Sequence, residues 1–236
     1  MARRLCLGLI LALTACKPTI IYDEPKPEQR PSDPADDPLV VHEAVREAVR
    51  GYTAALAQRD VEAATALVVD DTFWFYEDLR VAALRATREQ LEALDMMSVL
   101  MVLQIRATIG RAELEAVDGR GLFGLAVTKG MVGEGLDQVP LDDVWLDDVR
   151  TTASINVEGQ PIAWLRKNEA GWQIDIPEIV RRLGPAIEAA VREQVAADGK
   201  LRAAYTRLEI NSDEYLDVAI LDGPLELDEG ASEHAP

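Results

Sequence analysis

The sequence predicts an α+β fold, in which N-terminal helices pack on an antiparallel sheet and a helical extension follows. Three observations carry this prediction. From residue 38 onward, apolar residues recur at steps of three and four, which is the period of a helix buried on one side. Between residues 144 and 176 they alternate with polar residues, which is the period of a half-buried strand. After Pro177 the helical period returns.

Two helices are predicted at the start of the folded part. Asp37 followed by Pro38 is a helix-start signal, because aspartate caps free backbone amides and proline suits the first helical position. Asp60 begins a second, shorter helix in the same way. The first helix places its apolar residues on one face: Val41, Val45, Ala48, Val49, Tyr52 and Leu56.

A capping box and an apolar run predict a buried helix in the middle of the chain. Thr87 and Gln90 have the capping-box spacing, in which each side chain accepts a hydrogen bond from the other residue's amide. The predicted helix continues through the run from Met96 to Leu103, which is too short to span a bilayer. Its methionines suit either an adaptable pocket or an ordinary core.

The other helices have weaker signals. Residues 111–135 are predicted to form two short helices that separate at Asp118-Gly119. The C-terminal extension, residues 177–225, begins with a helix that we expect to break at Gly184-Pro185, because proline removes a backbone hydrogen bond. Residues 211–214 are expected to cap a last helix.

The segment from residue 144 to 176 predicts an antiparallel meander with one buried face. Ala153, Ile155 and Val157 alternate with polar residues in one predicted strand. Glu158-Gly159 and residues 168–171 have the composition of tight turns, and further strands follow each of them. Such alternation with short turns is typical of antiparallel strands that face water on one side.

Residues 1–16 have the pattern of an export signal. Two arginines precede an apolar run, and the small-residue segment Leu13-Thr14-Ala15-Cys16 follows. The run is shorter than the roughly 20 residues that a membrane-spanning helix needs. Residues 1–15 are therefore predicted to be a signal peptide. An ordinary cysteine after an ordinary signal, or a poorly formed anchor, remains the alternative.

The end of this segment resembles the lipobox of bacterial lipoproteins. The resemblance implies cleavage before Cys16, lipidation of its thiol and attachment to a membrane through the acyl chains. The other cysteine, Cys6, lies in the segment that would be removed, so the mature protein has no internal disulfide. Lys17 stands where an aspartate often signals inner-membrane retention, so we expect the outer membrane of the cell envelope. Which membrane and leaflet hold the anchor stays open.

Both ends of the predicted mature chain lie outside its folded part. Residues 16–37 contain the lipidated cysteine and a proline-rich acidic linker, which would space a domain from the membrane or serve as a generic disordered leader. Residues 226–236 are predicted to be a disordered acidic tail. With 42 acidic and 24 basic residues, the formal net charge is −18. This charge repels phosphate backbones and anionic lipid headgroups, so we expect no nucleic-acid partner.

The order of elements resembles the NTF2-like superfamily, also called SnoaL-like. The resemblance is carried by residues 44–52, 56–60 and 67–71, and by the closing strand pair at 163–175. It covers residues 38–176 and implies a curved antiparallel sheet that helices close into a cone. The mouth of such a cone holds a small apolar ligand. The fold hosts enzymes as well as inert interaction domains, so the resemblance implies no chemistry.

Four residues are the best candidates for the pocket of that cone by position: Tyr52, Asp70, Trp74 and Tyr76. Enzymes of this fold often place a carboxylate, tyrosine or histidine in the cavity. Tyr52 is alternatively a core residue whose hydroxyl reaches the rim, and Asp70 a turn or cap residue. We expect no catalytic residue and no cofactor.

A cluster of four aspartates is the strongest candidate for a metal site. Asp142, Asp143, Asp147 and Asp148 flank one predicted strand, and carboxylate oxygens suit Ca²⁺. Their spacing fits no calcium loop, so we interpret them as solvated acids and expect no metal. The sequence also contains no P-loop, GxGxxG, GxSxG, HExxH or CxxC motif.

The sequence therefore predicts a membrane-tethered envelope lipoprotein whose domain binds a small apolar ligand or another envelope protein without catalysis. A homodimer stays open as an assembly. The alternative is a lipid-anchored enzyme of isomerase or dehydratase type. A buried ionisable group with a second polar group directed at the same point would favour the enzyme, whereas an apolar cavity would favour the binding protein.

Replacing Cys16 with serine should release the mature protein from the membrane, because no basic or amphipathic segment replaces the acyl chains. Detergent phase partitioning of cells that make Cys16→Ser measures this. The control is Cys6→Ser, which lies in the predicted signal and should leave the protein in the detergent phase. Retention of mature Cys16→Ser in that phase would contradict the lipobox.

Overall fold

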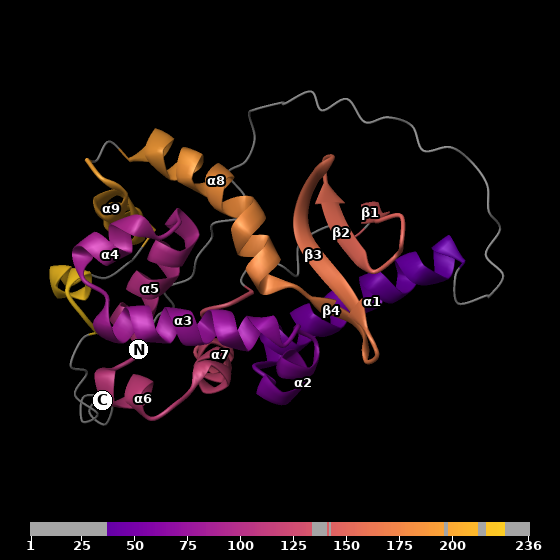
Figure 1. The fold of residues 1–236 in the computed structure, drawn as a ribbon, viewed down its shortest axis with the longest axis horizontal. Helices are drawn as coiled ribbons and strands as arrows, with labels where there is room; N and C mark the ends of the chain where they lie inside the picture. Colours follow the sequence, from indigo (N-terminus) through magenta and orange to yellow (C-terminus); the bar gives the residue numbers. More distant parts are fainter. Residues whose placement is uncertain (1–36, 134–140, 142, 196–197, 212–215, 225–236) are drawn as a thin grey trace, which may run out of the picture.

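The computed structural model describes residues 37–133, 141, 143–195, 198–211 and 216–224. Within these ranges the chain forms nine α-helices, a short 3₁₀ helix and a four-stranded antiparallel sheet, which confirms the α+β class. In Figure 1 the sheet and helix α1 lie at one end and most other helices lie at the opposite end. Helix α8 runs between the two ends.

The first two helices begin at the predicted residues. At the start of α1 (Pro38–Gln58), the Asp37 carboxylate accepts a hydrogen bond of 2.9 Å from the Leu39 amide. At the start of α2 (Val61–Ala66), Asp60 accepts one of 3.0 Å from the Ala63 amide. Helix α1 packs its apolar face against strands β1 and β4.

Four consecutive aromatic residues, at positions 73–76, lie in α3 (Asp71–Arg85), a helix that the sequence did not predict. Asp70 occupies its N-cap position but makes no capping hydrogen bond, so the usual start signal is absent. Aromatic residues are also modest helix formers. The helix is stabilised by its contacts with α5 and α7, which bury Tyr76, Leu79 and Ala83.

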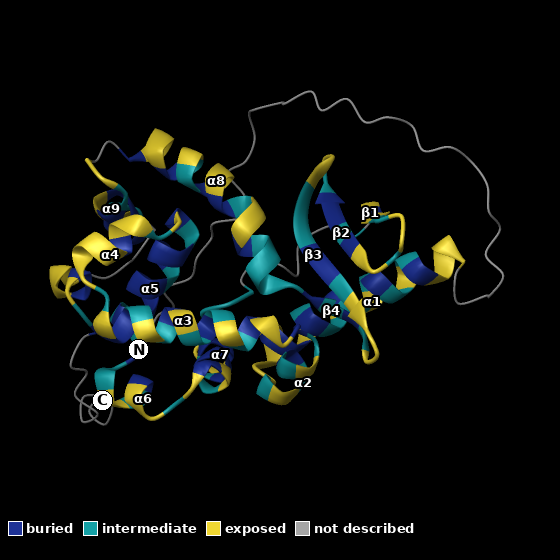
Figure 2. Cartoon of the chain, viewed as in Figure 1, coloured by how far each residue is buried: buried dark blue, intermediate teal, exposed yellow. Residues whose placement is uncertain are grey.

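The capping box at Thr87 is present, but the predicted long helix after it is wrong. It consists of two helices, α4 (Arg88–Ala93) and α5 (Met96–Thr108). The break follows from Asp95, whose carboxylate accepts a hydrogen bond of 2.9 Å from the Ser98 amide and so starts a new helix. Helix α5 is buried along most of its length, as predicted (Figure 2).

Helices α6 (Arg111–Glu115) and α7 (Gly119–Thr128) separate where the sequence predicts. Asp118 caps α7 by accepting a hydrogen bond of 2.8 Å from the Gly121 amide. Gly119 is needed for packing, because a Cβ at this position would lie 2.1 Å from the Phe73 carbonyl oxygen. Helix α7 therefore lies directly against the backbone of α3.

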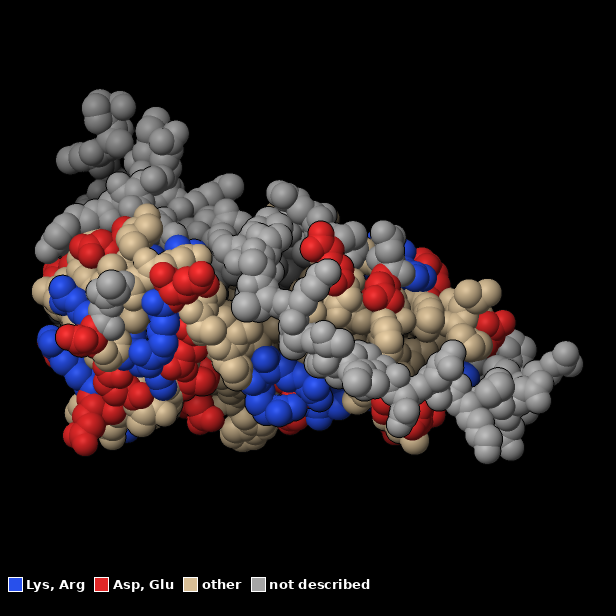
Figure 3. All heavy atoms as spheres, turned by 90° about the horizontal axis from the view of Figure 1, so that it is seen from above, with Lys and Arg blue, Asp and Glu red and all other residues tan. Residues whose placement is uncertain are grey.

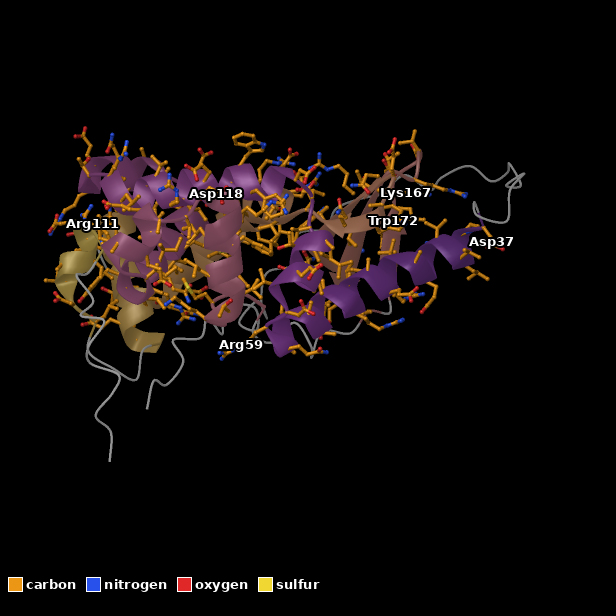
Figure 4. The ribbon with its side chains drawn as sticks, turned by 90° about the horizontal axis from the view of Figure 1, so that it is seen from below. Asp37, Arg59, Arg111, Asp118, Lys167 and Trp172 are labelled. Carbon is orange, nitrogen blue, oxygen red and sulfur yellow. The ribbon has the colours of Figure 1, made fainter. Side chains whose placement is uncertain are left out.

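The four strands form the predicted meander, in the order β1 (Asp143–Leu146), β2 (Thr152–Val157), β3 (Gln160–Asn168) and β4 (Gly171–Ile174). The two-residue turn at Glu158-Gly159 has positive φ at both positions, as the twist of a tight hairpin requires. Trp172 on β4 is 7% exposed and lies at the sheet end of the molecule, near α1 (Figure 4).

The predicted alternation fails at the end of β2. A register irregularity between Ile155 and Asn156 places two consecutive residues in the interior, so Asn156 is buried and Val157 is half-buried.

At the β4 edge of the sheet, the Val69 amide donates a hydrogen bond of 3.0 Å to the Ile174 carbonyl. The chain after α2 therefore extends the sheet beyond β4.

The predicted break in the next helix is wrong. Helix α8 (Ile176–Gln194) continues through Pro185. Proline leaves the carbonyl four residues before it without a partner, and here that residue is Arg181, which is exposed to water. Water can therefore satisfy this carbonyl, which reduces the cost of the proline.

The sequence did not predict α9 (Lys200–Asn211), because its cap comes from a distant residue. The Glu92 carboxylate on α4 accepts hydrogen bonds of 2.9 Å and 3.0 Å from the amides of Lys200 and Leu201. The last element is the 3₁₀ helix η3 (Val218–Leu221). Residues 212–214 of the expected cap, the predicted signal peptide, nearly all of the linker and the tail lie outside the described residues.

Arg106 on α5 joins three separate parts of the chain. Its side chain is fully buried and donates five hydrogen bonds of 2.7–3.1 Å, all to backbone carbonyls. Three of these carbonyls are at the end of α3 and two are at the end of η3, where few helix amides are left to pair with them. The Ala82 carbonyl also accepts a hydrogen bond of 2.9 Å from the Ala86 amide. Burial lowers the pKa of Arg106 to about 10, so the side chain stays cationic near neutral pH.

Replacing Arg106 with leucine should lower the free energy of unfolding by about 3 kcal/mol or more, because five hydrogen bonds to buried carbonyls are lost and, among the described residues, only the Ala82 carbonyl keeps a second donor. Chemical denaturation of the purified protein measures this. Arg88→Gln is a matched control, since it removes an exposed ion pair of 2.7 Å to Asp222, next to the same 3₁₀ helix. Its midpoint should stay close to wild type. Equal midpoints for the two variants would show that the five bonds contribute little.

Candidate functional site: an apolar cavity between helices and sheet

The described part of the molecule contains a cavity of about 220 Å³ between the sheet end and the helical end. Its walls come from α1, α3, α5, α7 and α8, and from strands β3 and β4. Most of the lining side chains are aliphatic or methionine; examples are Val49, Met97, Met101, Ile162, Ile174 and Leu183. Elements that are far apart in the sequence therefore meet at this site.

Helix α5 supplies one wall, because apolar residues occur on the side that faces the cavity as well as on the side that faces the core. Met97, Met101 and Ile105 are spaced by four residues, so they share one side of the helix and line the cavity. Val99 and Leu103, by contrast, are completely buried in the core. The two methionines are half-buried, as expected for side chains that border a hollow. Methionine is flexible and polarisable, so this wall can adapt to different ligand shapes.

The polar side chains of the lining are few: Tyr52, Thr53, Tyr76 and Gln104. The Thr53 hydroxyl donates a hydrogen bond of 3.0 Å to the Arg50 carbonyl. Tyr76 is 1% exposed, and its hydroxyl has no hydrogen-bond partner among the described residues. Burial raises the pKa of Tyr52 and of Tyr76 well above the ordinary value, and Tyr76 raises that of Tyr52 further. Both phenols therefore stay protonated.

Two of the four predicted pocket residues line this cavity and two do not. Tyr52 on α1 and Tyr76 on α3 are both in the wall. Asp70 is 93% exposed, with its carboxylate 3.8 Å from Arg120, and Trp74 is 73% exposed. The pocket prediction is corrected for these two residues. Trp74 lies two positions before Tyr76 in one helix, which directs the two rings to different sides.

The sequence reasoning missed the contribution of α8. Ile176, Ile179, Val180 and Leu183 line the cavity, although they fall almost wholly in the segment treated as an extension. Their spacing of three and four residues was a visible signal of an apolar face. What that face packs against was not visible, because it depends on residues far away in the sequence.

Two aspartates of the cluster, Asp143 and Asp147, accept hydrogen bonds from residues nearby in the sequence. The Asp147 carboxylate accepts hydrogen bonds of 2.8 Å and 3.1 Å from the amides of Thr151 and Thr152, and Asp143 accepts one of 2.9 Å from the Trp145 ring. Asp142 is outside the described residues. Among the residues that are described, no group of histidine, cysteine, aspartate and glutamate side chains has the geometry of a metal site.

Charge is distributed on the surface and is absent from the described cavity wall. On the face in Figure 3, acidic and basic side chains lie next to one another at the helical end. Oppositely charged side chains also pair locally along α8, where Glu178 contacts Arg181 and Arg182 at 2.5 Å each. The described residues that line the cavity include no aspartate, glutamate, lysine, arginine or histidine.

Comparisons of the chain with protein-family models, with curated proteins and with solved structures found no match. The helices in the described ranges also include none that is long and apolar enough to cross a membrane. The function of the site therefore has to be argued from its geometry and chemistry.

Proposed function

We propose that this protein binds a small apolar molecule in the cavity and performs no catalysis on it. The observation that carries the proposal is an almost wholly apolar cavity with walls from both ends of the molecule. Protein interiors are close-packed, so a hollow of this size forfeits contacts that a ligand would restore. Concave, mainly apolar sites with a few polar groups are also the usual form of small-molecule sites.

The volume sets the size of the ligand. An apolar cavity of about 150 Å³ in another protein stays dry and binds benzene. Scaled to about 220 Å³, the same packing accommodates roughly nine non-hydrogen atoms. This corresponds to a single substituted ring or a medium-length chain, and it excludes a full phospholipid or a long acyl chain bound entirely inside.

The enzyme alternative has no comparable support. An isomerase or dehydratase needs a proton donor or acceptor whose pKa lies near the working pH. The titratable groups in the described wall are two tyrosines, and burial moves the pKa of both away from neutrality. Asp70, the carboxylate with the best position in the sequence, points to solvent. Binding is therefore the function that we propose.

We further propose that the sheet and α1 form an NTF2-like cone and that acyl chains on Cys16 hold it in the cell envelope. Two features support the cone: α1 packs on a four-stranded antiparallel meander, and the cavity lies between these elements and helices α3, α5, α7 and α8. The export pattern and the cysteine that follows it support the anchor. Another envelope protein or a second copy of this chain stays the alternative partner.

Filling the cavity should abolish ligand binding. Ala163 on β3 lines the cavity, and Ala163→Phe would place a ring in it. Isopropylbenzene should raise the melting temperature of wild type, because a ligand that binds only the folded state stabilises it by about 2.7 kcal/mol at 100 times its dissociation constant. It should leave the melting temperature of Ala163→Phe unchanged.

The matched control is Ala189→Phe, an exposed position on α8 that does not line the cavity. This variant should respond to isopropylbenzene as wild type does. Thermal shift assays of the three proteins, each carrying Cys16→Ser and purified without detergent, test this prediction. If all three respond equally, or none responds, the cavity is not a ligand site.

A further inference from the structure

One residue of the cavity wall, Tyr76, carries a buried hydroxyl that makes no hydrogen bond with the described residues. The Tyr76 hydroxyl is inaccessible to solvent and has no partner among the described residues, although buried hydroxyls are nearly always hydrogen-bonded. Tyr76 also lines the cavity. Leaving a buried hydroxyl unpaired is destabilising. A ligand that pairs with it would recover this loss.

The direction of the missing hydrogen bond follows from the state of the tyrosine. Burial raises the pKa of Tyr76, so the group is a neutral phenol that carries its proton. Tyr52, the second tyrosine of the wall, is protonated for the same reason. A phenol whose proton has no acceptor needs an oxygen or nitrogen lone pair. The natural complement is therefore a hydrogen-bond acceptor on the ligand.

The charge of the ligand follows from the wall. None of the described lining residues carries a positive charge, so a carboxylate or phosphate in the cavity would be buried without a counter-ion. None carries a negative charge, so a buried ammonium would have the same problem. An unpaired buried charge is far more costly than an unpaired hydroxyl. The net charge of −18 also disfavours the approach of anions.

We propose that the ligand is a neutral apolar molecule with one carbonyl or ether oxygen, which accepts a hydrogen bond from the Tyr76 hydroxyl. This inference rests on the proposed function, because it names the chemical class of molecule that the same cavity takes. An anionic group inside the cavity would have no counter-ion among the described lining residues, and pure hydrocarbons would bind without the hydrogen bond. Ketones, aldehydes, esters and lactones of about nine non-hydrogen atoms have the required chemistry.

The test uses three probes of equal size: acetophenone, which has a carbonyl acceptor; isopropylbenzene, which has none; and benzoate, which is an anion. Their affinities are measured by titration calorimetry on the whole chain with Cys16→Ser, secreted and purified without detergent. The same titrations are made with Tyr76→Phe added. Loss of one neutral hydrogen bond should weaken acetophenone roughly two- to tenfold. Isopropylbenzene should bind both proteins equally, and benzoate should bind neither.

Stability without ligand separates a binding role from a structural one. Tyr76→Phe should not lower the melting temperature of the free protein, because it removes an unpaired hydroxyl and keeps the ring. Tyr205→Phe is the control, since its buried hydroxyl donates a hydrogen bond of 2.6 Å to the Leu216 carbonyl, and its loss should lower the melting temperature. A clear decrease for Tyr76→Phe would show that the hydroxyl has a structural partner, which overturns the inference.

The outcomes distinguish this inference from the proposed function. If isopropylbenzene and acetophenone bind, but Tyr76→Phe leaves both affinities unchanged, the cavity is a ligand site and the acceptor is wrong. Benzoate binding as tightly as acetophenone would overturn the neutral class. If no probe binds, the proposed function fails together with the inference.

Discussion

The buried guanidinium of Arg106 is the interaction on which the helical end of the molecule depends. A helix leaves its last carbonyls unpaired, and burying such an end without donors is costly. Here two helix ends, those of α3 and η3, point at the same buried cation. The negative ends of their dipoles also favour a positive charge at this place. One side chain therefore donates hydrogen bonds to the carbonyls at both helix ends, and it connects residues 82–86 with residues 220–221.

Helix α5 connects this buried guanidinium with the cavity. Arg106 lies near its C-terminal end, while Met97 and Met101 line the cavity from its first half. The helix is packed between α3, α8 and α9, so its position is determined on several sides. Because α3 carries Tyr76 and α8 carries several aliphatic wall residues, these contacts also determine where those side chains lie. The flexible methionine side chains are therefore carried by a helix that is packed on several sides.

The Tyr76 hydroxyl in the cavity wall differs from two other buried polar side chains, which pair with backbone carbonyls. In the core, Arg106 donates to five carbonyls, and Tyr205 donates to one. Tyr76 has an apolar wall and aromatic neighbours, Phe75 and Phe123, with ring centroids 5.9 Å and 5.2 Å from its own. These two rings pack against the Tyr76 ring, but they offer no acceptor to its hydroxyl group. Such a site reduces the stability of the empty protein and favours the protein with a ligand.

The sequence by itself determined the features that depend on neighbouring residues. Caps such as Asp37, Asp60 and Asp118 act within three residues, so they mark helix starts correctly. The meander followed from the alternation of apolar residues and from the turn at Glu158-Gly159, which are equally local. Helical spacing also placed Tyr52 on a buried face. Fold class and most element starts were therefore predictable.

Only the tertiary structure decided which of these elements meet. Helix α3 forms without a cap because other helices bury its face, and α9 starts on a carboxylate from α4. The wall of the cavity joins Tyr52, Tyr76 and Leu183, which no local pattern relates. The same holds for Asp70 and Trp74, whose sequence position suggested a pocket and whose side chains face water. Local hydrogen bonds and periodicity act over a few residues, whereas a cavity is formed by contacts between segments a hundred residues apart. Its location therefore became visible only when the chain was folded.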